Sequence, residues 1–255
     1  MNNILITGAA SGIGAATARL FHARGWQVGL VDIDQAGLAA LSAELGGAWH
    51  ASLDVCDVDA VQQALASFCT PHNGQLRLLF NGAGILRCGY FEEIEQAEHA
   101  RILQINVLGL LNVTHAAFAY LKGTPGAQVI NMGSASGVYG APYLASYSAS
   151  KFAVRGLTEA LELEWEPHGI RVGDLMPPFV RTPMVTSQQF KVPVMDRLGV
   201  TLVADDIALA AWQQAQEPLL HRPISVPFKL LYWSAQMCPT WLTRLIMRGL
   251  SREKT

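Results

Sequence analysis

The sequence predicts an α/β protein of one domain, with a doubly wound parallel sheet of about seven strands and helices on both faces. Two patterns carry this prediction. Short apolar runs alternate with longer segments of helical spacing, and most of the runs are apolar at consecutive positions, as in strands covered on both faces. With 255 residues, the chain is long enough to bury one large core.

The expected strands are rich in Val, Ile and Leu and cover residues 3–7, 27–31, 48–53, 76–80, 127–132, 170–175 and 223–226. The expected helices lie between them, at roughly 12–24, 35–45, 57–69, 95–121, 148–167 and 204–215. The alternation ends at Val226, where apolar helical segments and a basic tail follow. We therefore expect a main unit over residues 1–226. The remainder, 227–255, should be a helical extension packed on that unit or on a neighbouring subunit.

The composition excludes several classes of protein. Apolar residues make up 51% of the chain, charged residues make up 15%, and the net charge is −2, which indicates a folded protein and argues against a nucleic-acid partner. Neither the histidines nor the cysteines, which are Cys56, Cys69, Cys88 and Cys238, have the spacing of a metal site or a disulfide framework. We expect no metal and a reducing, cytoplasmic location. The N-terminus lacks a basic signal-peptide region, and no uninterrupted apolar run of about 18 residues predicts a membrane span.

Glycines cluster where the first strand meets the first helix. Gly8, Gly12 and Gly14 follow the run NILIT, in the spacing G-x-x-x-G-x-G. Glycines at such a turn let the backbone approach a pyrophosphate, and the helix N-terminus presents free N–H groups to it. The turn by itself is compatible with a purely structural role. Its position after the first strand favours a dinucleotide site.

An acidic residue closes the second expected strand. Asp32 lies eighteen residues after Gly14, where a carboxylate can accept hydrogen bonds from an adenosine ribose, and Asp34 is a competing candidate. A carboxylate there would repel a 2′-phosphate. Neither Ser11 nor Ile33, the neighbours that could have carried a positive charge, is basic. We therefore expect NAD rather than NADP as the cofactor.

A tyrosine and a lysine lie four positions apart in the stretch YSASK, with only small residues between them. Tyr147 and Lys151 therefore share one face of a helix. A nearby ammonium group favours the phenolate and lowers the pKa of the tyrosine, which can then exchange a proton with an alcohol or a carbonyl. Taken alone, the pair is better explained by a helix-starting tyrosine and a surface lysine.

Together these motifs resemble the short-chain dehydrogenase/reductase family over roughly residues 3–226. The family's T-G-x-x-x-G-x-G corresponds to Thr7–Gly14, and its Y-x-x-x-K to Tyr147–Lys151. Its catalytic serine matches Ser134 in NMGSASG, and its helix asparagine matches Asn106 in QINVLG. The resemblance implies a Rossmann-like fold and an oxidoreductase that uses a nicotinamide cofactor.

The resemblance also implies a role for each matched residue. Tyr147 would be the general acid/base, and Lys151 would lower its pKa and bind the nicotinamide ribose. Ser134 would bind the substrate oxygen, and Asn106 would hold a water molecule in a proton relay. The implied cofactor contacts are Gly8, Ser11, Gly12, Ile13, Gly14, Asp32, Asp54, Val55, Asn81, Gly82, Ala83, Tyr147, Lys151, Pro177, Val180 and Thr182.

The chain departs from the family pattern at two of these places. Gly82 replaces the second asparagine of the N-N-A-G motif, which puts one supporting hydrogen bond in doubt. Pro178 replaces the glycine after the sixth strand, which stiffens that loop and removes a backbone donor.

The segment 183–201 falls where the family has its substrate lid, and it is mostly apolar. This favours a hydrophobic secondary alcohol or ketone as substrate, although the same residues could simply pack the lid. An NADP-dependent carbonyl or 3-oxoacyl reductase is the alternative. In the family, the helices that correspond to 95–121 and 148–167 commonly form a homotetramer, so we expect a homo-oligomer.

The C-terminal tail departs most from the family. Pro239 suits a first helical position, and Trp241, Leu242, Leu245 and Ile246 would then share one side of a helix. Arg244 and Arg248 lie largely on the other side. We expect the apolar side to pack on the domain or a neighbouring subunit and to wall the substrate pocket. The alternative is contact with an anionic membrane surface, including an NAD-binding peripheral membrane protein with little turnover.

Overall fold

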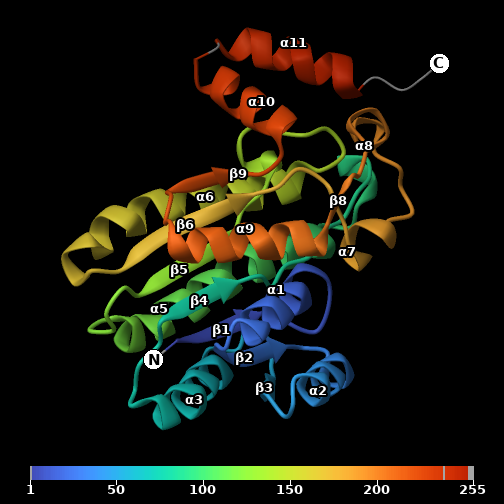
Figure 1. The fold of residues 1–255 in the computed structure, drawn as a ribbon. Helices are drawn as coiled ribbons and strands as arrows, with labels where there is room; N and C mark the ends of the chain where they lie inside the picture. Colours follow the sequence, from blue (N-terminus) through green and yellow to red (C-terminus); the bar gives the residue numbers. More distant parts are fainter. Residues whose placement is uncertain (1, 238, 252–255) are drawn as a thin grey trace.

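The computed structural model describes residues 2–237 and 239–251. Within these residues, one seven-stranded sheet forms the centre of the molecule, and every pair of neighbouring strands in it is parallel (Figure 1). The strand order is β3-β2-β1-β4-β5-β6-β9. The strands are β1 (Asn3–Thr7), β2 (Gln27–Asp32), β3 (Trp49–Ser52), β4 (Leu78–Asn81), β5 (Gln128–Met132), β6 (Arg171–Met176) and β9 (His221–Pro223). The predicted doubly wound α/β fold is confirmed.

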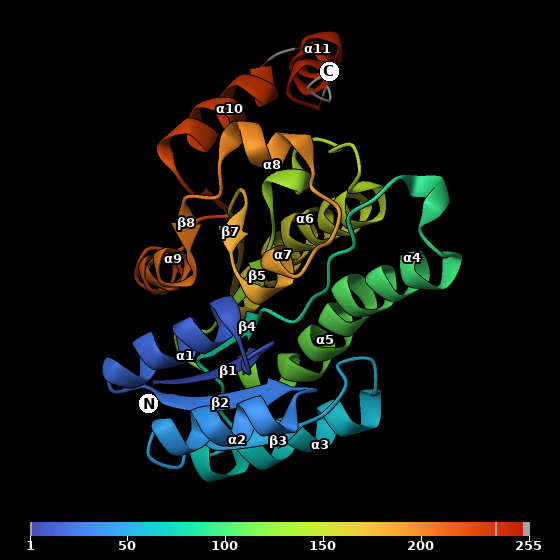
Figure 2. The same cartoon turned by 90° about the vertical axis from the view of Figure 1, so that its right-hand side faces the viewer.

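Helices cover both faces of the sheet (Figure 2). One face carries α1 (Gly12–Ala23), α2 (Gln35–Glu44) and α9 (Ala204–Gln216), which share an apolar cluster with the strands around Ile4, Ile6 and Leu30. The other face carries α3 (Val58–Cys69), α5 (Leu110–Leu121) and α6 (Ala145–Trp165), packed around Leu5, Leu79 and Val129. Successive side chains along each strand point to opposite faces of the sheet and pack in two separate apolar cores. This explains why the strands are continuous apolar runs in the sequence.

The chain reverses its winding direction between β1 and β4. Strand β1 pairs with β2 on one side and with β4 on the other, and the crossovers on the two sides run in opposite directions along the sheet. At such a switch point a crevice opens beyond the carboxyl ends of the strands, and ligands of doubly wound folds bind there. The loops after β1, β4, β5 and β6 meet at this edge.

Several boundaries differ from the sequence prediction. The last strand ends at Pro223, and Val226 already begins α10 (Val226–Met237), so the strand expected at 223–226 was placed too late. The helix expected at 95–121 consists of α4 (Gln96–Leu103) and α5, joined by a π-helical turn over Gln104–Gly109. The expected lid contains the short helices α7 (Pro183–Thr186) and α8 (Pro193–Leu198), with a two-stranded pair of β7 (Val180–Arg181) and β8 (Leu202–Val203) at its base.

The helix Gln96–Leu121 is long and apolar enough to cross a membrane by length and composition, which the sequence had not led us to expect. A core helix of a globular fold passes the same test. Here Ile102, Val113 and Leu121 are buried, and α5 packs on β4 and α3. The buried side of this segment covers the sheet, and 39% of its most apolar window is buried.

The C-terminal extension forms α10 and α11 (Thr240–Ser251), which lie together at one end of the molecule beyond β9 and α8 (Figures 1 and 2). Helix α11 begins one residue after Pro239, which therefore precedes the helix instead of occupying its first position. Phe228, Tyr232 and Met247 are buried in a third apolar cluster with lid residues such as Val192 and Val194. Cys238 lies outside the described residues, and the other three cysteines are free thiols.

Candidate active site

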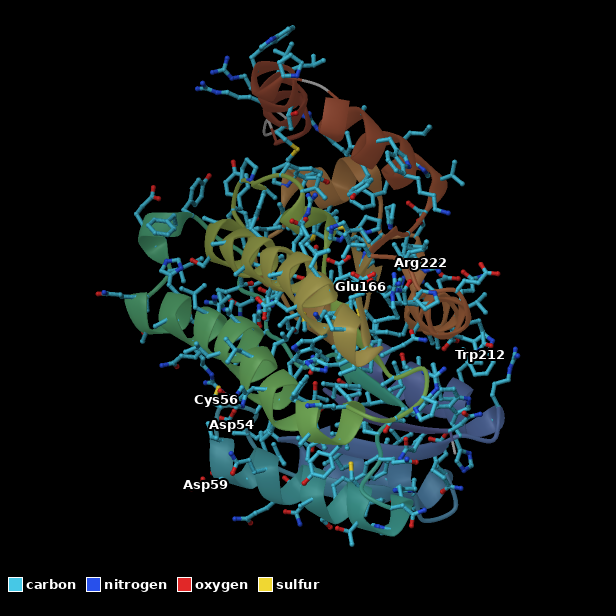
Figure 3. All side chains as sticks on the ribbon, turned by 90° about the vertical axis from the view of Figure 1, so that its left-hand side faces the viewer. Asp54, Cys56, Asp59, Glu166, Trp212 and Arg222 are labelled. Atoms are coloured by element: carbon cyan, nitrogen blue, oxygen red, sulfur yellow. The ribbon has the colours of Figure 1, made fainter. Side chains whose placement is uncertain are left out.

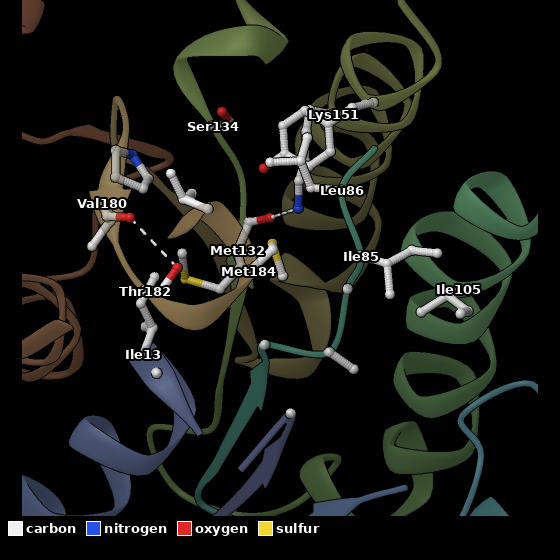
Figure 4. A pocket seen from close by; sticks show the side chains of 18 of the residues that line it. Ile13, Ile85, Leu86, Ile105, Met132, Ser134, Lys151, Val180, Thr182 and Met184 are labelled. Atoms are coloured by element: carbon white, nitrogen blue, oxygen red, sulfur yellow. Dashed lines mark hydrogen bonds between the residues drawn. The ribbon is translucent and has the colours of Figure 1, made fainter. Parts of the chain in front are cut away.

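A cavity of about 590 Å³ lies at the carboxyl ends of the central strands (Figure 4). It runs from the turn after β1, past the loops after β4 and β5, to the lid helix α7 and the lid residue Val194. Sixteen of the predicted site residues line it: Gly8, Ser11, Gly12, Ile13, Gly14, Asp32, Asp54, Val55, Gly82, Ala83, Ser134, Tyr147, Lys151, Pro177, Val180 and Thr182. Asn81 and Asn106 are buried behind the wall and do not line it.

The glycine turn has the geometry of a phosphate cradle. Gly8 and Gly12 have φ of 71° and 52°, a left-handed conformation that side chains other than glycine rarely adopt. A Cβ atom on Gly14 would lie 2.0 Å from the carbonyl oxygen of Gly8, so this position admits only glycine. Ser11 makes no side-chain bond to the N-terminus of α1, whose first residues face the cavity. The free N–H groups of this turn fit a pyrophosphate, because they supply donors and a partial positive charge.

The adenosine end of the cavity is acidic. Asp32 lies at the end of β2, and its carboxylate accepts hydrogen bonds from the backbone N–H of Ala10 at 3.0 Å and of Asp34 at 3.1 Å. Asp34 instead caps helix α2 through the N–H of Gly37. The competition between the two carboxylates is thereby resolved, because only Asp32 lines the cavity.

The loop after β3 forms the far wall of this end. Asp54 accepts a hydrogen bond from the N–H of Cys56 at 2.9 Å, and Figure 3 shows the two residues next to each other at the start of the α3 segment. The carbonyl of Val55 accepts from the Asn112 amide at 3.1 Å, which fixes the loop against α5. Arg101 of α4 also lines the cavity, a basic residue that the sequence pattern did not single out.

The loop after β4 is tied to β1 by its backbone. The hydroxyl of Thr7 accepts hydrogen bonds from the N–H groups of Gly82 at 3.1 Å and Ala83 at 3.2 Å. A Cβ atom on Gly82 would lie 2.7 Å from the Thr7 carbonyl oxygen and 2.8 Å from the Phe80 ring. The loop as folded therefore leaves no room for a side chain at position 82.

Asn81 supports the loop from inside the sheet. Its amide donates to Thr114 at 2.8 Å and to Asn131 at 2.9 Å. Gly82 cannot make the side-chain hydrogen bond of the asparagine that the family has there. In this structure the side chain of Asn81 and the hydroxyl of Thr7 support the loop instead. The Asn81 side chain points toward α5 and β5, and its expected contact with the cofactor stays a prediction.

Tyr147 lies in the first turn of α6, and its hydroxyl hydrogen-bonds to Ser134 in the cavity wall. Burial raises the pKa of Tyr147 to about 12, and the hydrogen bond from Ser134 lowers it only in part. The expected fall of this pKa beside Lys151 is therefore wrong for this structure. The cause is desolvation, which disfavours the phenolate. At neutral pH the phenol keeps its proton.

The Lys151 ammonium group is held by a backbone carbonyl. Its Nζ donates to the carbonyl oxygen of Met132 at 2.7 Å and lies 5.4 Å from the centroid of the Tyr147 ring (Figure 4). Burial lowers the pKa of Lys151 to about 8, against the opposing charge of Asp174. The ammonium therefore sits at the floor of the cavity between the end of β5 and the tyrosine.

Asn106 lies in the π-helical turn and hydrogen-bonds to the loop after β4. Its side-chain oxygen accepts from the N–H of Ile85 at 2.8 Å, and its amide donates to the Ile85 carbonyl at 3.0 Å and to Ser150 at 3.1 Å. A π-bulge of this kind recurs at functional sites. The side chain is committed to the loop after β4 and to α6, so it positions these two elements.

A buried carboxylate lies behind the catalytic wall, and the sequence analysis missed it. Asp174 of β6 is fully buried, and its Oδ1 lies 3.0 Å from Nδ1 of His221, whose Nε2 lies 3.0 Å from Glu159. Burial raises the pKa of Asp174. For His221, burial is the largest single influence and disfavours the charged ring, but the hydrogen bond and charge of Asp174 together with the bond to Glu159 outweigh it and raise the pKa. An acid inside the apolar run IRVGDL was the signal that could have revealed this pair.

The opposite end of the cavity is mostly apolar. Leu86, Leu144, Phe179, Met184, Val185 and Val194 line it, with Ser136, Tyr139, Ser187 and Gln188 as the polar members. Lid residue Phe190 packs on Tyr143, with ring centroids 5.1 Å apart, and on Tyr90, at 5.5 Å. Tyr143 itself has φ of 68°, so a left-handed residue at the mouth positions this aromatic contact.

Gln188 fastens the lid to the loop after β4. Its amide donates to the carbonyl of Leu86 at 3.1 Å, and its side-chain oxygen accepts from the N–H of Cys88 at 3.0 Å. A third bond, to the carbonyl of Met184 at 3.1 Å, holds the side chain in place. The lid is therefore closed over the cavity. No motif marked this glutamine, because its partners are backbone groups a hundred residues away.

Comparison with known proteins agrees with this geometry. A family model described as short chain dehydrogenase matches residues 2–192. The chain is 37% identical over 185 residues to a 3-alpha-(or 20-beta)-hydroxysteroid dehydrogenase of Mycobacterium tuberculosis, covering 71% of this chain and 69% of the relative. It is 33% identical over 184 residues to a 3-oxoacyl-(acyl-carrier-protein) reductase of Thermotoga maritima, covering 71% and 74%.

A solved structure has the same fold. The 3-ketoacyl-(acyl-carrier-protein) reductase of Brucella melitensis, complexed with NADH, superposes with a TM-score of 0.79 at 29% identity, covering 88% of this chain and 96% of that one. The glycine cradle and the cavity have the geometry expected of the family whose model matches the chain. The chain therefore belongs to the short-chain dehydrogenase family and is an oxidoreductase that acts on CH–OH groups with a nicotinamide cofactor.

Proposed function

We propose that the protein is an NAD-dependent dehydrogenase that interconverts a hydrophobic secondary alcohol and its ketone. One observation carries this proposal: a single cavity joins the glycine cradle and Asp32 at one end to Ser134, Tyr147 and an apolar lid at the other. A dinucleotide bound along the cradle would bring its nicotinamide to the middle of this cavity, which lies against the tyrosine.

The residues of the chain supply the acid–base chemistry. The nicotinamide, when bound, gives or accepts the hydride. The Tyr147 phenol, which keeps its proton at neutral pH, can donate that proton to a carbonyl oxygen during reduction and take it back from an alcohol during oxidation. The Ser134 hydroxyl lies beside the phenol and can hydrogen-bond to the same oxygen. Lys151, held by Met132, keeps a positive charge at the cavity floor below about pH 8.

The preference for NAD over NADP rests on Asp32. A 2′-phosphate would lie against a carboxylate that is fixed by two backbone N–H groups and cannot easily turn away. The side chain of the next residue, Ile33, is exposed and carries no charge. The Brucella relative, whose structure was solved with NADH, supports the same preference. An NADP-dependent carbonyl or 3-oxoacyl reductase remains the second candidate, and the name of the Thermotoga relative, a 3-oxoacyl-(acyl-carrier-protein) reductase, supports its substrate.

An apolar substrate fits the lid end of the cavity. Its walls are Leu86, Leu144, Met184 and Val194, while its polar members are fewer, and Ser134 and Tyr147 line the same cavity. Pockets with this distribution bind an apolar body and orient one polar group. The mycobacterial relative, named for hydroxysteroid substrates, supports a bulky alicyclic alcohol.

We further propose a homo-oligomer built on the α4–α5 and α6 helices. These helices and the π-helical turn between α4 and α5 expose five large apolar side chains, namely Leu103, Leu108, Leu111, Phe152 and Leu163. A second copy packed on the same helices would remove this surface from water.

The test is a cofactor and substrate screen. Purified protein is assayed with NAD and NADP against sterols, other alicyclic secondary alcohols and small polyols, and with NADH and NADPH against the matching ketones and a 3-oxoacyl thioester. We expect the highest kcat/KM for NAD with a bulky apolar alcohol, or for NADH with its ketone. A clear preference for NADPH and the 3-oxoacyl thioester would instead establish the second candidate.

A further inference from the structure

The C-terminal extension exposes a row of large apolar side chains. On α10, Val226, Leu230 and Trp233 follow the spacing of one helical face and are 71%, 70% and 64% exposed. The opposite face of α10 carries Phe228 and Tyr232, which are buried in the cluster that includes the lid. The helix is therefore anchored on the domain by one side and presents its other apolar side to solvent.

Helix α11 repeats this arrangement. Trp241 and Leu245 are 66% and 57% exposed, whereas Met247 is buried. The sequence pattern predicted that Trp241 and Leu245 pack inward, and this prediction is wrong. The structure instead buries the side of α11 around Met247, because α11 rests on α8, where Arg197 donates to the carbonyl of Gly249. We call the exposed set of Val226, Leu230, Trp233, Trp241 and Leu245 the tail face.

Basic residues border the tail face. Lys229, Arg244 and Arg248 are exposed, and none of the three forms an ion pair within residues 2–237 and 239–251. The sequence has no acidic residue between Glu217 and Glu253. Residues 218–255 carry six Lys or Arg against one Glu, while the rest of the chain carries 12 against 19 acids. The C-terminal part of the sequence thus has a net positive charge, whereas the rest of the chain has a net negative charge.

This combination indicates which occupant would cover the face. A second copy seated on it would bring two positive borders together, which is unfavourable. An anionic lipid surface would suit both the apolar side chains and the basic residues. Tryptophan and leucine enter the boundary between headgroups and acyl chains, and Lys and Arg attract the anionic headgroups. The family match ends at residue 192, so the shared dehydrogenase core does not account for the tail face.

We propose that the tail face docks the enzyme on the surface of an anionic lipid bilayer. Helices α10 and α11 lie in the interface with their exposed apolar side chains inserted and their basic residues at the headgroups. The buried side of α10 packs in the same apolar cluster as Val192 and Val194 of the lid. Docking therefore brings the lid end of the cavity toward the membrane, where apolar molecules dissolve.

The experiment uses the full-length protein and vesicles of two compositions, pure phosphatidylcholine and phosphatidylcholine with about one third phosphatidylglycerol. Co-sedimentation is measured at low and high salt, and tryptophan quenching is measured with brominated acyl chains. We compare the wild type with Trp233→Ser/Trp241→Ser and with Arg244→Gln/Arg248→Gln. The matched controls are Leu209→Ser, an exposed apolar residue on α9, and Arg19→Gln/Lys122→Gln, which removes two charges elsewhere. NADH affinity reports whether each variant is folded.

We expect the wild type to bind anionic vesicles at low salt, to bind neutral vesicles at least tenfold more weakly, and to be quenched by bromine. Each tail variant should lose roughly tenfold or more of this affinity, since the tryptophans supply insertion and the arginines supply attraction. Both controls should bind like the wild type. The proposal is overturned if the wild type fails to bind anionic vesicles, or if the tail variants bind as well as the controls. It is also overturned if the Trp variant instead lowers the molar mass measured by light scattering while no variant binds lipid, because the face would then join subunits.

Discussion

Loss of the Gln188 side chain should open the lid. Two of its hydrogen bonds join the lid to the opposite wall of the cavity, at Leu86 and Cys88. Each such bond contributes about 0.5–1.5 kcal/mol, so Gln188→Leu should favour the open lid by about 1–3 kcal/mol. The remaining lid contact, Phe190 on Tyr90 and Tyr143, is left in place by this change.

Limited proteolysis measures the opening without any substrate. Lys191 is an exposed trypsin site in the lid, and cleavage after it requires the segment to leave the cavity wall. When opening and closing are fast, the cleavage rate follows the population of the open form. A change of 1–3 kcal/mol corresponds to cleavage roughly 5- to 150-fold faster. The KM for an apolar substrate should rise, while NADH affinity should change little, because Gln188 lies at the lid end of the cavity.

Gln189→Leu is the matched control. It makes the same substitution one residue further along, at an exposed side chain for which the structure shows no hydrogen bond among the described residues. If both variants are cleaved at the same rate, Gln188 does not fasten the lid. The reasoning fails in the same way if Gln188→Leu accelerates cleavage throughout the chain, since that would indicate global unfolding.

Three further predictions concern the catalytic wall and the cofactor. Tyr147→Phe removes only the exchangeable proton and should reduce kcat roughly 100-fold or more with NADH affinity nearly unchanged; near-normal turnover would refute its role as acid/base. Lys151→Met should raise the stability of the ligand-free protein by roughly 3 kcal/mol near neutral pH, because it removes a buried ammonium whose pKa is lowered from 10.5 to about 8. The unfolded chain binds this proton between those pH values and the folded chain does not, so the gain, measured by thermal unfolding, should shrink as the pH rises from 8 to 10.5. Asp32→Ala should narrow the preference for NADH over NADPH roughly tenfold or more, and equal binding of the two cofactors by the wild type would contradict the assignment.

Local patterns in the sequence were enough to predict the core of the site. Gly8, Gly12 and Gly14 are needed by the backbone of one turn, and Tyr147 and Lys151 share a helix face because they are one turn apart. The apolar runs predicted the strands because the pattern is again local: a strand buried on both faces is apolar at nearly every position. Errors at the strand and helix ends, as at Pro223 and Pro239, arose where the pattern is weakest.

Some features depend on segments that meet only in the folded chain. Gln188 bonds to backbone groups near Leu86, and Asp174 pairs with His221 across neighbouring strands. Residue type does not encode such partners, because a backbone carbonyl or N–H group is the same at every position. The resemblance to a family likewise gave Asn106 a role, but its three hydrogen bonds to Ile85 and Ser150 were decided by the packing of a helix against a loop.

The sequence by itself determined the doubly wound sheet, the phosphate cradle and the tyrosine–lysine pair, because each follows from spacing within one element or from the alternation of elements. The tertiary structure alone decided whether the pKa of Tyr147 is raised or lowered, how the lid is fastened over the cavity and which side of α11 faces solvent. These depend on desolvation and on contacts between distant segments. The periodicity of α11 marked an apolar stripe at Trp241 and Leu245, but only the position of α8 and the lid determined that this stripe points outward.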